Sequence, residues 1–164
     1  MTVPARPRGT ASRGPDEVSA LDKRIIEHLQ QDGRRPFTQI AAELGVSEAA
    51  VRARTNRLVE RGILQVVGVT DPLKLGFQQQ AMIGVRCERD RLLQVSEAVS
   101  AFPEVDYVVI TAGTFDLLIE VVCENNEALL HFLTEKLRAV DGVRETETFV
   151  YLRMVKQTYQ WGTR

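Results

Sequence analysis

The 164-residue sequence has few cysteines, histidines and aromatic residues, and no long apolar run. No stretch approaches the roughly 20 apolar residues that a membrane-spanning helix requires, and the N-terminus lacks the apolar core of a signal peptide. The two cysteines, Cys87 and Cys123, lie in apolar, strand-like runs without CxxC or Cys/His spacing. We therefore expect a cytoplasmic protein with no membrane partner and two buried free thiols; a disulfide or a metal site is the weaker alternative.

Groups suited to catalysis are also scarce. The two histidines, His28 and His131, fall on expected helices, and neither has a Cys, Ser or His at a spacing that would form a nucleophile–base pair. The sequence contains no glycine-rich phosphate-binding loop. An enzyme is therefore disfavoured, and we expect no catalytic residue, no metal and no cofactor.

Charge is distributed unevenly, although the total is only −1. Residues 1–18 carry a net charge of +1, residues 19–75 carry +2 and residues 76–164 carry −4. This asymmetry weakly suggests one part that faces nucleic acid and a second, separate part. Residues 1–18 are rich in Pro, Gly and Arg without periodicity, so we expect a disordered basic tail. The alternative is an arm that contacts DNA through Arg6, Arg8 and Arg13.

Residues 19–64 have the pattern of three short helices. Ser19 and Ser47 are the expected N-caps of the first and third helices, and Gly33 and Gly45 end the first and second. The third helix should face the core with residues spaced four and three apart, Val51, Thr55 and Leu58. A short helix, a glycine-containing turn and a capped second helix predict a helix-turn-helix. The following "ILQVVGVT" predicts a strand or short extended ribbon.

The other face of the third helix carries arginines and small residues. An α-helix fits the DNA major groove, where alanines allow close approach, arginine can pair with guanine or phosphate, and asparagine can pair with adenine. The candidate DNA-binding residues are Thr38, Ser47, Glu48, Ala49, Ala50, Arg52, Ala53, Arg54, Asn56 and Arg57. For Arg54, which lies beside the core stripe, a structural ion pair is an equal alternative. An arginine-bearing helix can also be simply a solvated, well-formed helix.

Residues 78–160 alternate between strand-like and helix-like segments in the order β-α-β-β-α-β, which is typical of a ferredoxin-like domain. Residues 65–77 are the expected ribbon and turn-rich hinge between the two domains. The predicted fold class is therefore α+β: an N-terminal winged helix-turn-helix, with three helices and a short β-ribbon, linked to a C-terminal ferredoxin-like domain.

The expected strands are apolar on both faces. In the third strand, Leu117, Ile119 and Val121 alternate with Leu118 and Val122. Two helices can cover only one face of a four-stranded sheet, so the second face requires another partner. A homodimer that packs sheet against sheet is the most economical solution.

The segment from "LDKRIIEHLQ" to "VRARTNRLVERGIL", the hinge "DPLKLG", "TAGTFDLLIEV" and the "DGVRETETFV…MVK" ending closely resemble the Lrp/AsnC family of transcription regulators. The resemblance covers about residues 19–160. It implies dimers formed through the ferredoxin-like domain, possible assembly of four dimers into an octamer, double-stranded DNA as partner, and a small effector, usually an amino acid, bound between these domains. Effector binding would then change assembly or DNA affinity.

The same resemblance implies effector-binding residues at Ala112, Gly113, Thr114, Asp116, Thr146 and Thr148. Asp116 could accept hydrogen bonds from an ammonium group, and backbone amides near Gly113 could bind a carboxylate. Thr114 and Phe115 depart from the family, where many members have a polar or acidic residue and a tyrosine. Structural alternatives remain: a hairpin turn with positive φ at Gly113, a hydrogen bond from Asp116 to that turn, and ordinary strand positions for Thr146 and Thr148.

An RNA-binding domain also shows the β-α-β-β-α-β order. Such domains stack bases on aromatic residues in a segment of the form K/R-G-F/Y-G/A-F-V-x-F/Y. Neither "TFVYLRMV" nor "FDLLIEVV" matches this pattern, and the C-terminal half is acidic, which disfavours binding of a polyanion. A DNA-binding regulator is therefore the favoured function.

Overall fold

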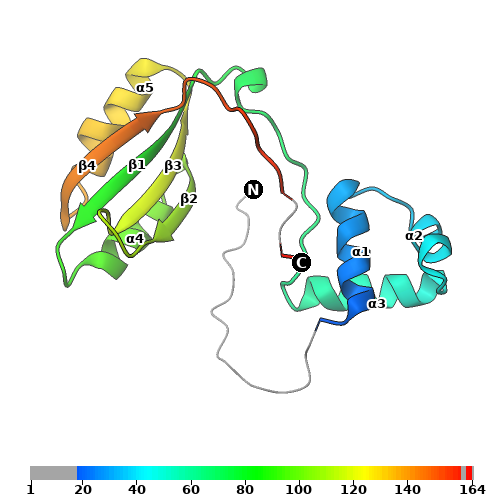
Figure 1. Ribbon diagram of the computed structural model, residues 1–164. Helices are drawn as coiled ribbons and strands as arrows, with labels where there is room; N and C mark the ends of the chain where they lie inside the picture. The colour runs from blue at the N-terminus through cyan, green and yellow to red at the C-terminus, as the bar shows by residue number, and fades with distance from the viewer. Residues whose placement is uncertain (1–17, 160–161, 164) are drawn as a thin grey trace. The chain divides into compact units, whose positions relative to one another are not determined.

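The computed structural model describes residues 18–159, 162 and 163. The arginines of the predicted tail, Arg6, Arg8 and Arg13, lie outside the described residues. The chain divides into two compact units, Met1–Gly68 with Gln157–Arg164 and Val69–Lys156 (Figure 1). Along the described part of the chain, no helix combines the length and apolar character that crossing a membrane requires.

The first unit contains the three predicted helices, Ala20–Gln31 (α1), Phe37–Leu44 (α2) and Glu48–Glu60 (α3). Ser19 and Asp22 form a reciprocal capping box at the start of α1, and the Ser47 hydroxyl accepts a hydrogen bond from the Ala50 amide at the start of α3. Gly45 ends α2 with φ of 69°. The predicted caps and the α2 terminator are therefore confirmed.

The core of this unit is a cluster of buried apolar side chains from all three helices and from Leu64, which follows α3: Ile25, Ile26, Leu29, Ile40, Ala41, Val51, Leu58 and Leu64. Thr55 is also buried, so the predicted inward stripe of α3 is confirmed. Burial of this stripe fixes which face of α3 remains exposed.

The prediction of a strand after α3 is wrong. Residues 64–71 have no regular secondary structure. Leu64 packs in the core, whereas Val66, Val67 and Val69 are exposed. A β-strand needs a neighbouring strand for its backbone hydrogen bonds, and in the described part of this unit no segment is a strand. A short 3-10 turn, Leu73–Leu75 (η1), follows.

The second unit is a four-stranded antiparallel sheet with two helical segments. Its strands are Gln79–Cys87 (β1), Val105–Ile110 (β2), Leu117–Cys123 (β3) and Val143–Val150 (β4). Its helices are Leu92–Ser100 (α4) and Asn126–His131 (α5), and α5 continues as a π-helix, Phe132–Leu137 (η2). The spatial order β2-β3-β1-β4 confirms the predicted ferredoxin-like topology.

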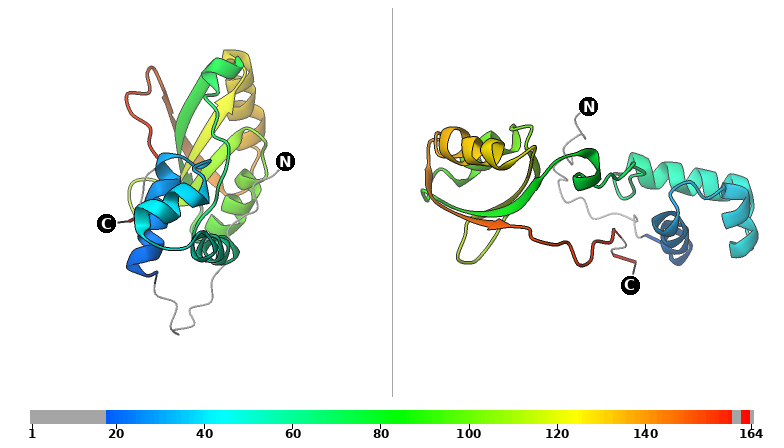
Figure 2. Two further views of the ribbon diagram at one scale, coloured as in Figure 1. Left: turned by 90° about the vertical axis from the view of Figure 1, so that its right-hand side faces the viewer. Right: turned by 90° about the horizontal axis from the view of Figure 1, so that it is seen from above.

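Both helical segments pack on the same face of this sheet (Figures 1 and 2). On β1, the residues under the helices are fully buried, with Ala81, Ile83 and Val85 at 0% exposure. A T-shaped contact between Phe102 and Phe132, with ring centroids 5.7 Å apart, adds to this core. Cys87 and Cys123 are buried and free, as predicted, and burial raises the pKa of both thiols.

The opposite face of the sheet carries Met82, Leu118, Val122 and Phe149. These side chains alternate with the buried ones, and they are half-buried or, for Phe149, 45% exposed. This surface, with Gly84 and Arg86, is called the uncovered face below. The prediction that both faces of the sheet carry apolar residues is confirmed.

Gly142, before β4, has φ of +96°, and a Cβ there would lie 2.6 Å from the Arg91 Cβ. We expect Gly142→Ala to lower the free energy of unfolding by about 1–3 kcal/mol, because both the backbone conformation and the space disfavour a side chain. Gly113 has no positive φ and no heavy atom within 4 Å of an added Cβ. Gly113→Ala is therefore the matched control and should change stability little; urea unfolding of both variants tests the difference.

Candidate functional site

The outward face of α3 is exposed, as its buried stripe requires. Ala49, Ala53 and Asn56 are exposed, and Thr38 is exposed in the first turn of α2. A shallow, open depression on this face is lined by five of the predicted DNA-binding residues, Glu48, Ala49, Arg52, Ala53 and Asn56. These side chains therefore share one surface on which the backbone of α3 can be approached closely.

Arg52 is held in place at the edge of this surface. It forms an ion pair with Glu48, one helical turn earlier, at 2.5 Å. Its guanidinium also lies over the Phe37 ring, 5.2 Å from the centroid, which is a cation–π contact between α3 and α2. Phe37 is not among the candidates predicted from the sequence, although an aromatic residue in the first turn of the second helix is a signal that could have identified it.

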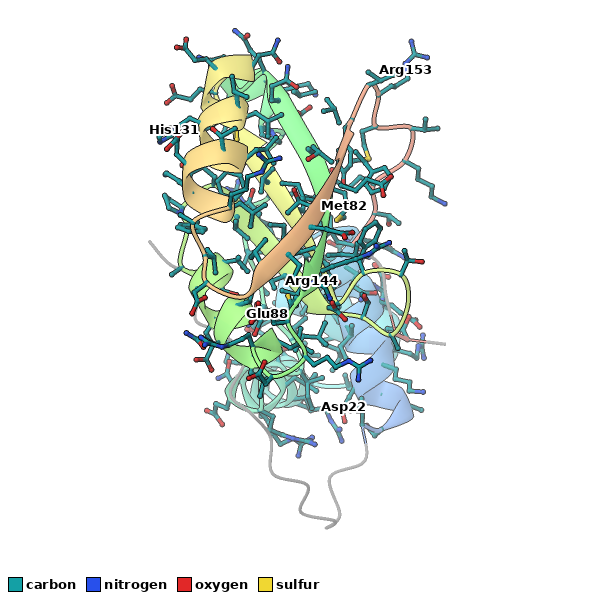
Figure 3. The ribbon with its side chains drawn as sticks, turned by 90° about the vertical axis from the view of Figure 1, so that its left-hand side faces the viewer. Asp22, Met82, Glu88, His131, Arg144 and Arg153 are labelled. Carbon is teal, nitrogen blue, oxygen red and sulfur yellow. The ribbon has the colours of Figure 1, made fainter. Side chains whose placement is uncertain are left out.

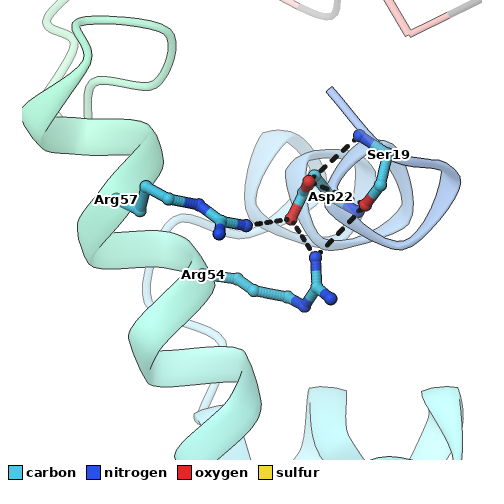
Figure 4. A network of polar contacts seen from close by, with 4 residues as sticks. All are labelled: Ser19, Asp22, Arg54 and Arg57. Atoms are coloured by element: carbon cyan, nitrogen blue, oxygen red, sulfur yellow. Dashed lines mark hydrogen bonds and ion pairs between the residues drawn. The ribbon is translucent and has the colours of Figure 1, made fainter. Parts of the chain in front are cut away.

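Arg54 and Arg57 point toward α1, where they meet the Asp22 carboxylate (Figure 4). Arg54 Nη1 lies 2.9 Å from Asp22 Oδ1 and donates to the Ser19 hydroxyl at 3.2 Å. Arg57 Nη2 lies 3.6 Å from the same Asp22 oxygen, too long for a hydrogen bond. Asp22 is only 3% exposed. The geometry therefore favours the structural alternative for Arg54 and leaves Arg57, half of whose side chain is exposed, with only a weak internal partner.

Ser19 completes the environment of Asp22, donating to the carboxylate from its amide at 3.0 Å and from its hydroxyl at 2.7 Å. Burial alone would raise the pKa of Asp22, but the hydrogen bonds from Ser19 and Arg54 outweigh burial and hold this pKa below its ordinary value. The ionised carboxylate is thus the stable form, and it anchors α3 to the start of α1.

Two other predicted residues serve the helix itself. The Ser47 hydroxyl is used as the α3 cap, and Ala50 is half-buried. The free surface of α3 is therefore narrower than the predicted set and consists of Ala49, Arg52, Ala53, Asn56 and Arg57, flanked by Glu48.

Because the folded-state pKa of Asp22 is lowered, its ionised carboxylate stabilises the fold above the unfolded-state pKa of about 4, and this contribution is lost as pH falls through the folded-state pKa. We expect Asp22→Asn to reduce stability at pH 7 by about 1–3 kcal/mol, since Arg54 loses its charged partner. The difference from the unmodified chain should shrink as pH falls below about 4 and through the lowered folded-state pKa. Urea unfolding followed by circular dichroism measures this; an equal difference at every pH would contradict it.

The predicted effector residues Ala112, Gly113 and Thr114 form an exposed loop between β2 and β3. At the end of this loop, one Asp116 carboxylate oxygen accepts a hydrogen bond from the Cys87 amide at 2.8 Å. The Asp116 amide donates to the Val85 carbonyl at 2.9 Å. Asp116 thus ties the start of β3 to the end of β1, and only one of its carboxylate oxygens takes part in these hydrogen bonds.

Thr146 and Thr148 lie on the other side of the sheet from this loop. They pair with Val85 and Ile83, which face the helices. The loop lies over the opposite, uncovered face, because the Thr114 carbonyl accepts a hydrogen bond from Arg86 Nε at 3.0 Å. Thr146 instead contributes to a hollow with Arg138, Val143, Arg144 and Glu145. The structure therefore does not bring the two predicted groups together within one subunit.

His131 projects from α5 away from the sheet (Figure 3), and His28 Nδ1 lies 2.8 Å from Arg35 Nη1. Within residues 18–159, 162 and 163, no group of three or more His, Cys, Asp or Glu side chains could hold a metal ion.

Family models match both units of the chain. The AsnC-type helix-turn-helix domain matches residues 19–59, and the Lrp/AsnC ligand binding domain matches residues 80–161. The chain is 36% identical over 147 residues to the "Uncharacterized HTH-type transcriptional regulator PH0140" of Pyrococcus horikoshii, covering 89% of this chain and 90% of that protein.

Two solved structures share the fold. One is AsnC of E. coli, with a TM-score of 0.80 and 24% identity over 88% of this chain and 98% of the other. The second is the transcriptional regulator NMB0573 of Neisseria meningitidis in complex with L-Met, with a TM-score of 0.81 and 23% identity over 89% and 97% of the two chains. Together with the two matched domains, the sequence relationship shows that this chain belongs to the Lrp/AsnC family of transcriptional regulators.

Proposed function

We propose that this chain is a cytoplasmic, sequence-specific regulator of transcription that binds double-stranded DNA and responds to a small effector, an amino acid, rather than an enzyme. The proposal rests on one observation. The same chain contains a helix-turn-helix, in which one face of α3 is exposed, and a ligand-binding domain. The proposed division is residues 19–64 for DNA binding, a linker at 65–77, and 78–160 for sensing and assembly.

The free face of α3 supports a major-groove contact. Its alanines, Ala49 and Ala53, allow the helix backbone to come close to the bases, and Asn56, three residues after Ala53, can pair with adenine. Arg57 can exchange its weak 3.6 Å contact with Asp22 for a DNA phosphate or a guanine. Thr38, at the start of α2, is placed to donate to a phosphate.

We expect Arg57→Ala to weaken binding to the selected operator DNA by about tenfold, equivalent to about 1.4 kcal/mol, because a charged DNA contact is lost. Fluorescence anisotropy at fixed salt measures this, and sedimentation should show an unchanged assembly. Arg89→Ala is the control, since it removes an exposed arginine from the sheet unit. Equal affinity of the Arg57→Ala and unmodified chains would place the DNA contact elsewhere.

The uncovered face supports a homodimer. Its apolar side chains, Met82, Leu118 and Phe149, lie on adjacent strands with no helix above them. A second copy is the proposed occupant because the same face on both subunits can pair around a two-fold axis. Such a dimer would present two α3 helices to a roughly palindromic site. An octamer of four dimers is the larger assembly that the family resemblance implies.

The effector loop has the groups that an amino acid needs. Asp116 keeps one carboxylate oxygen for an ammonium group, and the exposed backbone at Ala112–Thr114 can donate to a carboxylate. The structural neighbour NMB0573 was solved with L-Met, which makes L-methionine the first amino acid to test here. Thr146 and Thr148, on the other side of the sheet, would take part only if a second subunit brings the two groups together.

We expect at least one of the twenty amino acids, which include L-methionine, to raise the melting temperature of the chain. A ligand that binds only the folded state stabilises that state. Asp116→Asn should reduce this shift. Repeating DNA binding and sedimentation with the active amino acid tests whether it changes affinity or assembly. No shift with any of the twenty would overturn the effector proposal and leave DNA binding standing.

A further inference from the structure

The loop between β2 and β3 folds back over the uncovered face of its own sheet. The Phe115 ring lies directly against the backbone of Gly84, in the middle of β1. A Cβ built on Gly84 would be 2.6 Å from two carbons of this ring. Any side chain at position 84 would therefore displace Phe115. The ring can occupy this position only because residue 84 is glycine.

Two further side chains hold the ring in this position. The Arg86 guanidinium lies over Phe115, 5.6 Å from the ring centroid, and its Nε donates to the Thr114 carbonyl. Arg86 is itself paired with Glu145 of β4 at 2.8 Å. Phe149, also of β4, makes a T-shaped contact with Phe115, with centroids 6.3 Å apart. Gly84, Arg86, Phe115 and Phe149 are called the loop clasp below.

The tip of the loop has no comparable support. No heavy atom lies within 4 Å of a Cβ built on Gly113, and Ala112 and Thr114 are exposed. The base of the loop is closed by Thr111, whose hydroxyl donates to the Phe115 carbonyl and whose amide donates to the Asp116 carbonyl. The position of the tip is therefore set by the base and by the loop clasp.

We propose that Phe115 is the positioning residue of the effector loop. Seated on Gly84, the ring fixes Gly113 and Asp116 relative to each other, so that one amino acid can reach both. This inference rests on the proposed effector function.

The first test compares L-methionine binding, or binding of the most active of the other nineteen amino acids, by isothermal titration calorimetry. We expect Phe115→Ala to weaken amino-acid binding about tenfold or more, whereas Phe115→Tyr, which keeps the ring, stays within about twofold. Phe102→Ala is the matched control, because it removes a T-shaped aromatic contact on the helix-covered face of the same sheet. Similar losses of affinity in Phe115→Ala and Phe102→Ala would overturn the positioning role.

A double-mutant cycle tests the clasp without any ligand. Gly84→Ala should lower the midpoint of urea unfolding in the unmodified chain, because its Cβ displaces the ring. In the Phe115→Ala background the same methyl group meets empty space. The decreases in the unfolding midpoint caused by Gly84→Ala and by Phe115→Ala should therefore not add. Additive effects would show that the ring does not rest on Gly84 and would overturn the clasp.

The two tests separate the possible failures. If the unmodified chain binds an amino acid and Phe115→Ala binds it equally well, the positioning role is wrong and the effector function stands. If the unmodified chain binds none of the twenty, the effector function fails and the role of Phe115 in it fails too, while the cycle still decides whether the clasp exists.

Discussion

Two helices cover one face of the four-stranded sheet. The other face also carries apolar side chains, and the need to shield them from water governs how the sheet unit is organised. Ile83 and Ile119 are fully buried beneath α4, α5 and η2, whereas Met82 and Leu118, which alternate with them, lie on the uncovered face. The chain covers the middle of this face with its own loop, through Phe115 on Gly84. In the proposed dimer, a second subunit covers the rest of the face, and the loop between β2 and β3 is therefore also part of the packing surface.

Features that depend on neighbouring residues could be predicted from the sequence. Ser19 and Ser47 cap helices because each cap needs only an amide two or three residues later. The buried stripe of α3 and the order of strands and helices follow from periodicity. The family resemblance also located the loop that contains Gly113 and Asp116.

Features that depend on distant partners could not be predicted in the same way. The "ILQVVGVT" segment has strand-forming residues, but its strand requires a partner that the described unit lacks. Arg54 was ambiguous because its position on α3 does not reveal Asp22, 32 residues earlier in the chain. The contact between Gly84 and Phe115 arises only when β1 and β3 pair, so neither residue was a candidate. Thr146 and Thr148 fall on the face opposite the loop because of the β1–β4 register.

Each of the three arginines of α3 has an acidic partner within the helix-turn-helix unit. Arg52 is paired with Glu48, Arg54 with Asp22, and Arg57 lies close to the same Asp22 carboxylate. Each charge that stays in an internal pair is unavailable to displace a counterion from DNA. The logarithm of the DNA-binding constant falls with the logarithm of salt concentration by about 0.9 per neutralised phosphate. A DNA-binding surface whose arginines stay in internal pairs would therefore show a shallow dependence of DNA affinity on salt concentration. Discrimination between operators would then come from contacts to the base edges, and it would persist over a wide range of ionic strength.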